Sequence, residues 1–318
     1  MSKSINVQSN NAVTITGKLN DVVVREGTSK NGGKPYRAGT VTIRVEQTYG
    51  GKGEISEIPV QFIAMKFKKD GTSNPAYESV GQLTSQFKSI QNYGYDEASR
   101  IRVAGKSGNI SENMFVGRDG EQVVSSWRIN SSFFNEVRGG EAPGNADCAT
   151  FNMDIFIMAM TREMTAEGEE TGRLKIRGGL VKYGGKVDCL DFFVENPTAI
   201  DFIERNYNQN DTAHFVGRIR FTSETITRQS ENTWGESIPQ TTTRKKRELI
   251  ITGPGIGHED GPNEEENSYN PEDIRVAMAD RNTLKEQKKI EARAKAKTGK
   301  AAPAAATSSA APTYDWEE

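Results

Sequence analysis

The chain has 318 residues, of which 34% are hydrophobic, and its mean hydropathy is −0.67. It contains no apolar run of about 18 residues, and residues 1–15 are polar, so we expect neither a membrane span nor secretion and assign the protein to a cytoplasm. Residues 1–253 carry 32 Lys/Arg and 30 Asp/Glu, whereas residues 254–318 carry 9 and 13, which indicates a slightly basic body and an acidic tail.

Residues 12–253 are predicted to form short β-strands. Runs rich in Val, Ile, Thr and Phe alternate with turns rich in Gly, Asn and Asp. In the run at 40–45 the odd positions, such as Val41, are apolar and the even positions, such as Arg44, are polar. This alternation is typical of a half-buried sheet with a polar outer face.

Two stretches before the tail, 75–91 and 197–207, have apolar residues at helical spacing. Each begins with proline behind a candidate cap, Asn74 or Asn196. An Asn-Tyr pair follows each helix, and a strand with a Val-x-Gly step or its near equivalent comes next. Because the order of these features is the same in both halves, we predict two copies of one module.

Each copy is predicted to contain three strands, a helix and two further strands. The expected strands are 12–24, 37–47, 54–68, 98–115 and 121–137 in the first copy, and 149–164, 172–183, 186–195, 212–229 and 241–252 in the second. This order is that of the OB fold, a five-stranded Greek-key barrel. We therefore predict a mainly β protein with OB-like domains at 10–138 and 139–253, one helix in each, and a disordered tail at 254–318. Unrelated α+β or sandwich domains are the alternative.

Two segments of the first half carry motifs. An apolar-x-apolar-x-Gly-x-Leu strand at 13–19 leads through a Gly-containing loop to the strand at 40–45, and the segment 100–106 is followed by Asp119-Gly120. In these features, residues 10–138 resemble bacterial single-stranded DNA-binding proteins. The resemblance implies OB folds that bind single-stranded DNA. Residues 139–253 do not resemble that family directly, which favours a phage or mobile-element version.

The tail changes composition along its length. Residues 259–273 contain seven acidic residues and no basic one, while 283–300 contain seven Lys/Arg against two Glu, and a transient helix is possible over 271–296. An Ala/Pro/Ser/Thr linker then leads to the tip, which is Tyr314, Asp315, Trp316, Glu317 and Glu318. Many proteins that coat single strands end similarly. We expect the tip to bind replication or recombination proteins and to compete with DNA for its groove.

Binding a single strand requires cations for phosphates and flat rings on which bases stack. The candidate residues are Arg25, Lys34, Tyr36, Arg37, Arg44, Phe62, Lys66, Phe67, Arg118, Trp127 and Arg128 in the first copy, and Lys175, Arg177, Tyr183, Arg218, Arg220, Trp234 and Arg244 in the second. For Phe62, a place inside the barrel fits the alternation equally well. Lys175 and Arg177 also fit an ordinary solvated face.

Catalytic motifs are absent or incomplete. Gly105-Lys106-Ser107 imitates the end of a phosphate loop, but Arg100 stands where the first glycine should be. No nucleophile elbow occurs, and two cysteines and two histidines are too few and too scattered for a structural zinc site, a disulfide framework or histidine-based catalysis. We therefore predict a protein that is not an enzyme and needs no cofactor or metal. Carboxylate-only metal catalysis is the enzymatic alternative.

These observations together predict a protein that coats single-stranded DNA without regard to sequence during phage-type replication, recombination or repair. Its expected partners are single-stranded DNA and, through the tip, replication or recombination proteins, with no membrane contact. A structural or assembly protein of a virus or mobile element is one alternative. An RNA-binding regulator that uses the same barrels is another.

Overall fold

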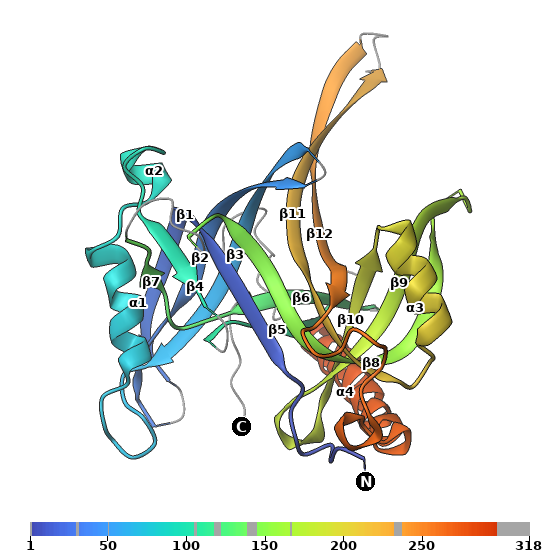
Figure 1. The fold of residues 1–318 in the computed structure, drawn as a ribbon. Coiled ribbons are helices and arrows are strands. Elements are labelled where there is room, and N and C mark those ends of the chain that lie inside the picture. The colour runs from blue at the N-terminus through green and yellow to red at the C-terminus, as the bar shows by residue number, and fades with distance from the viewer. Residues whose placement is uncertain are drawn as a thin grey trace.

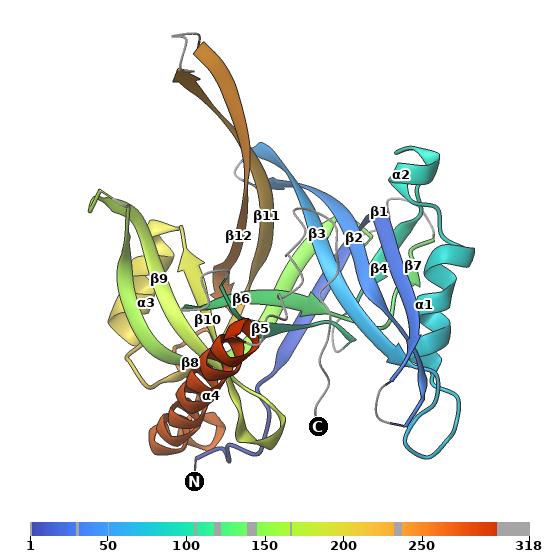
Figure 2. The same ribbon diagram turned by 180° about the vertical axis from the view of Figure 1, so that it is seen from behind.

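The computed structural model describes most of the chain (Figure 1). The described residues are 2–29, 32–49, 51–104, 107–117, 122–138, 145–165, 167–231 and 237–297. The side chains of 224–231, 237–240, 242–244 and 295–297 are not among them. Two neighbouring β-barrels form the body (Figures 1 and 2).

Barrel one follows the OB order of pairing. Its strands are β1 (Asn11–Thr28), β2 (Pro35–Tyr49), β3 (Lys52–Met65), β4 (Arg100–Val103), β5 (Asn109–Val116), β6 (Val123–Asn130) and the short β7 (Asn135–Glu136). Strands β1, β2 and β3 pair antiparallel in sequence, β3 pairs parallel with β6, and β6 pairs antiparallel with β5. Strand β4 returns to pair antiparallel with β1.

Barrel two repeats that order. Its strands are β8 (Cys148–Met164), β9 (Glu170–Val181), β10 (Val187–Val194), β11 (Thr212–Glu231) and β12 (Ser237–Pro254). The first three pair antiparallel in sequence, β10 pairs parallel with β12, and β11 pairs antiparallel with both β12 and β8. The parallel pair stands at the same place in both barrels, so the predicted tandem OB architecture is confirmed.

The expected strand at 98–115 is divided into β4 and β5. Between them the amide of Val13 donates to the carbonyl oxygen of Gly108 at 3.0 Å. A Cβ atom at Gly108 would lie 2.8 Å from the carbonyl oxygen of Val13, so only glycine allows this approach. The chain therefore leaves β1 at this point, and β5 pairs with β6 instead.

The helices begin where their caps predicted. They are α1 (Pro75–Ser85), α2 (Ile90–Tyr93) and α3 (Pro197–Asn206), with 3₁₀ turns at Tyr183–Gly185 and Glu265–Asn267. The Asn74 side chain accepts from the amide of Ala76 at 3.1 Å, and Asn196 accepts from Thr198 at 2.9 Å. The first helix ends at Ser85 rather than at 91, and the short α2 follows it.

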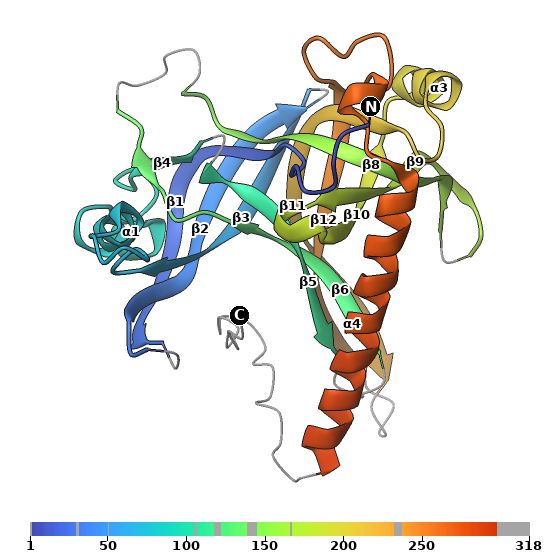
Figure 3. The ribbon, with the colours of Figure 1, turned by 90° about the horizontal axis from the view of Figure 1, so that it is seen from below.

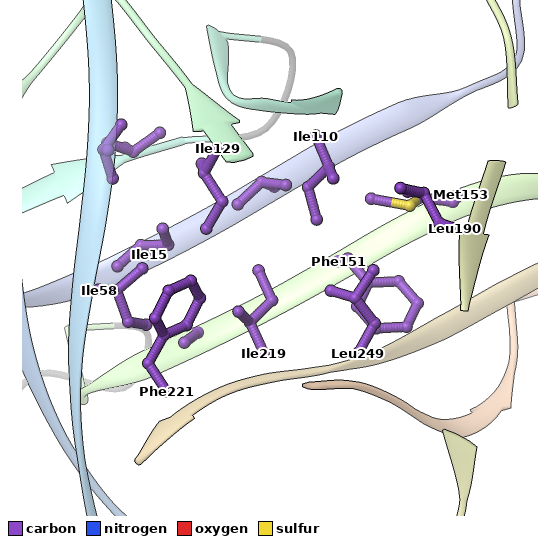
Figure 4. Close-up of a cluster of buried hydrophobic side chains, with 14 of the residues drawn as sticks. Ile15, Ile58, Ile110, Ile129, Phe151, Met153, Leu190, Ile219, Phe221 and Leu249 are labelled. Atoms are coloured by element: carbon purple, nitrogen blue, oxygen red, sulfur yellow. The ribbon is translucent and has the colours of Figure 1, made fainter. Parts of the chain in front are cut away.

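The two barrels share one continuous core. Residues Asn11–Thr16 of β1 pair antiparallel with Cys148–Met153 of β8, which extends one sheet through both barrels. Figure 4 shows the apolar side chains that meet there, among them Ile15 and Ile110 from barrel one and Phe151 and Ile219 from barrel two. Beyond the barrels, β11 and β12 continue as a long two-stranded ribbon (Figure 1).

The expectation of a flexible tail beginning at 254 is wrong for residues 254–297. Helix α4 (Pro271–Lys297) lies against both barrels (Figure 3), and Ile274, Ala277 and Arg281 are buried. Their spacing of three and four residues puts them on one side of the helix. The low mean hydropathy of the tail concealed this stripe. Residues 298–318, which include the predicted tip, lie outside the described residues.

Among the helices that the structure describes, none has both the length and the apolar character needed to cross a membrane.

Candidate nucleic-acid interface

A groove lies on the outer face of barrel one where β3, β6 and β5 run side by side. Its volume is about 440 Å³. Most of its lining residues are polar, and the lining consists of Gln61, Phe62, Ile63, Ser107, Asn109, Ser111, Arg128, Asn130, Ser131, Ser132 and Phe133. In OB folds the outer face around the second and third strands, with the adjoining loops, binds oligonucleotides, and the groove shares the third strand, β3, with that surface.

Strand alternation puts these side chains on the outer face. In β5, Ile110 points into the core while Asn109 and Ser111 point outward. The register pairs Asn109 with Asn130 and Ser111 with Arg128. The parallel pairing of β3 with β6 then brings Gln61 beside Asn130.

Hydrogen bonds fix the floor of the groove. The Nδ2 atom of Asn130 donates to Oδ1 of Asn109 at 3.2 Å and to Oγ of Ser111 at 2.9 Å. The Arg128 guanidinium donates to Ser111 and to Oε1 of Gln61, each at 3.4 Å. The polar groups are thus held in place before any ligand arrives.

Exposed rings stand at both ends of this polar face. Phe133 is 42% exposed at the carboxyl end of β6, and Phe115 is 46% exposed near the end of β5. Phe115 shares the outer face with Asn109 and Ser111, because all three occupy alternate positions of one strand. Two rings with a polar track between them match what unstacked bases require.

A cationic surface, which we call the basic end, adjoins the groove. It comprises Arg25, Lys34, Lys66, Lys68 and Lys69, all of them exposed. The amide of Lys66 donates to the carbonyl oxygen of Pro35 at 2.9 Å, so the end of β3 lies beside the β1–β2 turn. The hydroxyl of Ser132 donates to the carbonyl oxygen of Ile63 at 2.9 Å, which connects this end to the groove.

The cations of the basic end are available to an anionic ligand. Within the described residues, none of the five forms an ion pair. One acidic residue, Asp70, lies in the same loop, and its carboxylate accepts from the amide and hydroxyl of Thr72. Those hydrogen bonds lower the pKa of Asp70, so it stays charged and reduces the local positive potential somewhat.

Five of the predicted residues meet at this end of barrel one: Arg25, Lys34, Tyr36, Lys66 and Phe67. Tyr36 pairs with Met65 across the strands, and the Lys66 ammonium lies 5.6 Å from the centre of the Phe67 ring. Arg128 lies in the groove itself.

Two predicted cations of barrel one already have partners. Arg37 is paired with Glu26 at 2.8 Å and stacks on Tyr77 of α1. Arg44 is paired with Glu46 at 2.8 Å. Both are therefore partly neutralised.

Two predicted aromatic residues of barrel one are not available to DNA. Phe62 is only 3% exposed, and its ring lies edge-on to Phe134 at 6.1 Å. Trp127 is half-buried against the core, 5.1 Å from the Phe221 ring of barrel two. Both corrections have the same cause, since these side chains point to the inner side of their strands.

The predicted cations of β9 share one carboxylate, which offsets one of their two positive charges. Lys175 and Arg177 contact Asp191 of β10 at 3.0 and 2.7 Å. Burial alone would raise the pKa of Asp191, but the hydrogen bonds from Arg177 and Lys175 outweigh it and lower that pKa. Tyr183 is 84% exposed, but it stands in the β9–β10 turn apart from any groove found in barrel two.

Arg218 and Arg220 join the barrels rather than face solvent. Arg218 is 7% exposed and contacts Glu54 of β3 and Glu195 at 3.3 and 2.8 Å. Arg220 contacts the same two carboxylates and Glu248. The prediction that these arginines bind DNA is wrong for this structure, because their charges are used between barrel one and barrel two.

The remaining predictions lie outside what the structure describes. Arg118, Trp234 and the tip residues Tyr314, Asp315, Trp316, Glu317 and Glu318 are not among the described residues. Arg244 lies in β12, but its side chain is not described.

Helix α4 covers the equivalent outer face of barrel two. Cys189 of β10 lies under the helix, with its sulfur 3.4 Å from that of Met278. Nearby, Arg281 of α4 forms a buried ion pair with Glu112 of β5. The amide of Cys189 also donates to Glu112, at 3.0 Å. One carboxylate thus connects both barrels and the helix.

Sequence reasoning missed Asn109, Phe115, Asn130 and Phe133 as site residues. A signal exists in β5, where polar or aromatic side chains occupy the odd positions 109–115. The buried acidic residue Glu112 interrupts the apolar series at the even positions. The sequence of β5 therefore lacks the regular alternation of apolar and polar residues that would have identified its outer face.

Comparison with known proteins adds a family and several distant structural likenesses. A family model described as YorF matches residues 9–291. The chain belongs to the YorF family. No curated protein sequence matches the chain.

Among solved structures, the chain is similar to the single-stranded DNA-binding protein of Thermus aquaticus. A deletion mutant of that protein shares 14% identity, with 81% of this chain and 99% of that chain covered and a TM-score of 0.46. The wild-type protein shares 11%, with 79% and 96% covered and a TM-score of 0.45. A replication protein A heterotrimer bound to single-stranded DNA shares 11% identity, covers 88% and 70%, and has a TM-score of 0.19.

Proposed function

We propose that this protein binds single-stranded DNA along the outer face of barrel one and coats it during phage-type replication or recombination. The observation that carries the proposal is the juxtaposition of the basic end with a groove lined by polar side chains and Phe133, with Phe115 farther along β5 on the same outer face. The cations neutralise phosphates and release counterions, and the rings stack unpaired bases. The action is stoichiometric and requires no reaction.

The groove favours an unpaired strand over a duplex. Its Asn, Gln and Ser side chains hydrogen-bond to groups on base edges, which a duplex engages in pairing. Phe133 can stack only on a base that has lost a neighbour. Duplex DNA would meet the cations of the basic end but not the floor of the groove.

A direct test measures the affinity of the full chain for a labelled oligothymidine by fluorescence anisotropy at several salt concentrations. We expect the affinity to fall as salt rises, and unlabelled duplex of the same length to compete poorly. The matching RNA distinguishes a DNA-binding protein from an RNA regulator. Absence of binding at low salt would contradict the proposal and favour an assembly protein.

The tail is proposed to recruit partners through its acidic aromatic tip, from Tyr314 to Glu318. A polyanionic tip competes with DNA for the same cations. Deletion of residues 302–318 should therefore leave DNA affinity unchanged or higher and weaken capture of replication or recombination proteins. A clear loss of DNA affinity in this deletion variant would contradict the competition.

A further inference from the structure

Amide and hydroxyl groups are more abundant in the groove than strand coating requires. Cations and rings are sufficient for binding without sequence preference. The groove instead brings together three amide side chains, Gln61, Asn109 and Asn130, beside the Ser111 hydroxyl. Such groups recognise bases by hydrogen bonds to their edges.

The hydrogen-bond network determines which atoms remain for a ligand. The Nδ2 atom of Asn130 makes two donations, so both of its protons are used. Within the described residues, Oδ1 of Asn130 and Nδ2 of Asn109 have no partner. An acceptor and a donor on two joined side chains complement the mixed donor and acceptor edge of a base.

The ring at the end of the groove is also fixed. The hydroxyl of Ser131 accepts from the amide of Phe133 at 3.2 Å and donates to its carbonyl oxygen at 3.0 Å. The backbone that carries this exposed ring is therefore held against a buried serine. A base stacked on Phe133 would lie beside the hydrogen-bonded Asn109–Asn130 pair, which lines the same groove.

We propose that the groove reads the edge of an unstacked base and so gives the protein a base preference within an otherwise general affinity for single-stranded DNA. This inference rests on the proposed function. A base that fits satisfies the free donor and acceptor, whereas a base that does not fit leaves them unpaired in a partly desolvated groove. Phosphate contacts at the basic end are blind to sequence.

The test compares dissociation constants for labelled dT, dC and dA oligomers of equal length. The proteins are the full-length wild type, an Asn109→Ala/Asn130→Ala double variant, and Lys66→Ala as a matched control. Bases differ in intrinsic stacking, but that difference is the same for every variant. The change in the spread of the three constants therefore isolates the groove.

For the wild type, we expect the dissociation constants of the dT, dC and dA oligomers to differ by about tenfold or more, since one bidentate contact discriminates bases by about 5- to 150-fold. The double variant should reduce that spread severalfold, while Lys66→Ala weakens all three by one common factor. An unchanged spread in a double variant that melts like the wild type would overturn the base reading but leave strand binding intact. Failure of the wild type to bind any oligomer would instead overturn the proposed function.

Discussion

The two barrels share one topology but use their outer faces differently. In barrel one the face across β3, β6 and β5 is open and carries a groove beside cations that form no ion pair with any described residue. In barrel two the corresponding face across β10 has α4 at one end and the ion pairs of Asp191 at the other. Under the proposed function, one copy of the duplicated fold keeps its outer face for DNA, while the other uses this face for contacts within the chain.

The comparison teaches that the number of cations on a strand does not measure its ability to bind DNA. Lys175 and Arg177 occupy the same kind of position as cations on an OB binding face, yet Asp191 stands across from Arg177 in the register. Among the residues that the structure describes, no carboxylate forms an ion pair with Lys34 or Lys66. The cross-strand partner decides whether a cation is free.

The largest expected effect is on stability and concerns helix α4, which lies over β10 of barrel two. Arg281→Leu leaves the buried Glu112 carboxylate without its cation, and we expect the free energy of unfolding to fall by about 3–5 kcal/mol. Urea unfolding followed by circular dichroism measures the loss. Arg275→Leu, which removes the exposed pair with Glu272 on the same helix, is the control and should leave the unfolding midpoint unchanged. Equal midpoints for both variants would mean that α4 does not hold the barrels together.

The next effect compares one exposed ring from each barrel. Phe133→Ala should weaken oligothymidine binding by about 1–3 kcal/mol, because a stacking platform is lost. Tyr183→Ala removes a ring that is more exposed, 84% against 42%, but that belongs to barrel two. Its affinity should equal that of the wild type. If Tyr183→Ala were the weaker binder, the DNA would lie on barrel two and our assignment of the faces would be reversed.

The free energy of unfolding should depend on pH through Asp154, a residue of barrel two. Burial alone would raise the pKa of Asp154 in β8, but hydrogen bonds from His214 and the Asn10 amide and the nearby Lys3 charge lower it to about 2. The unfolded chain therefore takes up the proton first as pH falls. The resulting stability, about 2 kcal/mol, is complete above about pH 4 and lost between about pH 4 and 2.

Asp154→Asn removes that contribution at neutral pH, so its unfolding free energy should be lower there and flatter across the acid range. Parallel denaturant titrations of the variant and the wild type from pH 2 to 7 measure both. Identical acid profiles would show that Asp154 does not fasten the N-terminal segment to barrel two.

The smallest expected effect is on the salt dependence of the affinity for single-stranded DNA. Lys66→Ala should reduce the slope of log affinity against log salt by about 0.7, the value for one phosphate contact on a single strand. Lys175→Ala removes a cation of barrel two that is paired with Asp191, so it should leave the slope unchanged. Equal reductions by both variants would indicate a path that crosses both barrels.

The sequence was sufficient to predict the strands, the duplication and the helix caps, because alternation, asparagine caps and proline starts act locally. It could not predict which face of a strand is inside. Phe62 lies in β3 and Phe133 lies just after β6, yet Phe62 is buried and Phe133 is exposed.

Ion pairs between residues far apart in the chain also could not be predicted from the sequence. The acceptor of Arg218, Glu54, lies 164 residues earlier in the chain, so nothing near Arg218 indicates that its charge is used. The same is true of Arg281, whose partner Glu112 lies 169 residues earlier in the chain. Composition alone therefore overstated the DNA-binding surface of barrel two and the length of the tail.

The two faces of the β5–β6 hairpin have different neighbours. Asn109, Ser111 and Arg128 face the groove, while Glu112 on the reverse side accepts from α4 and from β10. A nucleotide chain seated in front and the C-terminal helix behind would press on the same thin sheet of two strands. Under the proposed function, the bound strand and helix α4 would therefore lie on opposite sides of the same two strands.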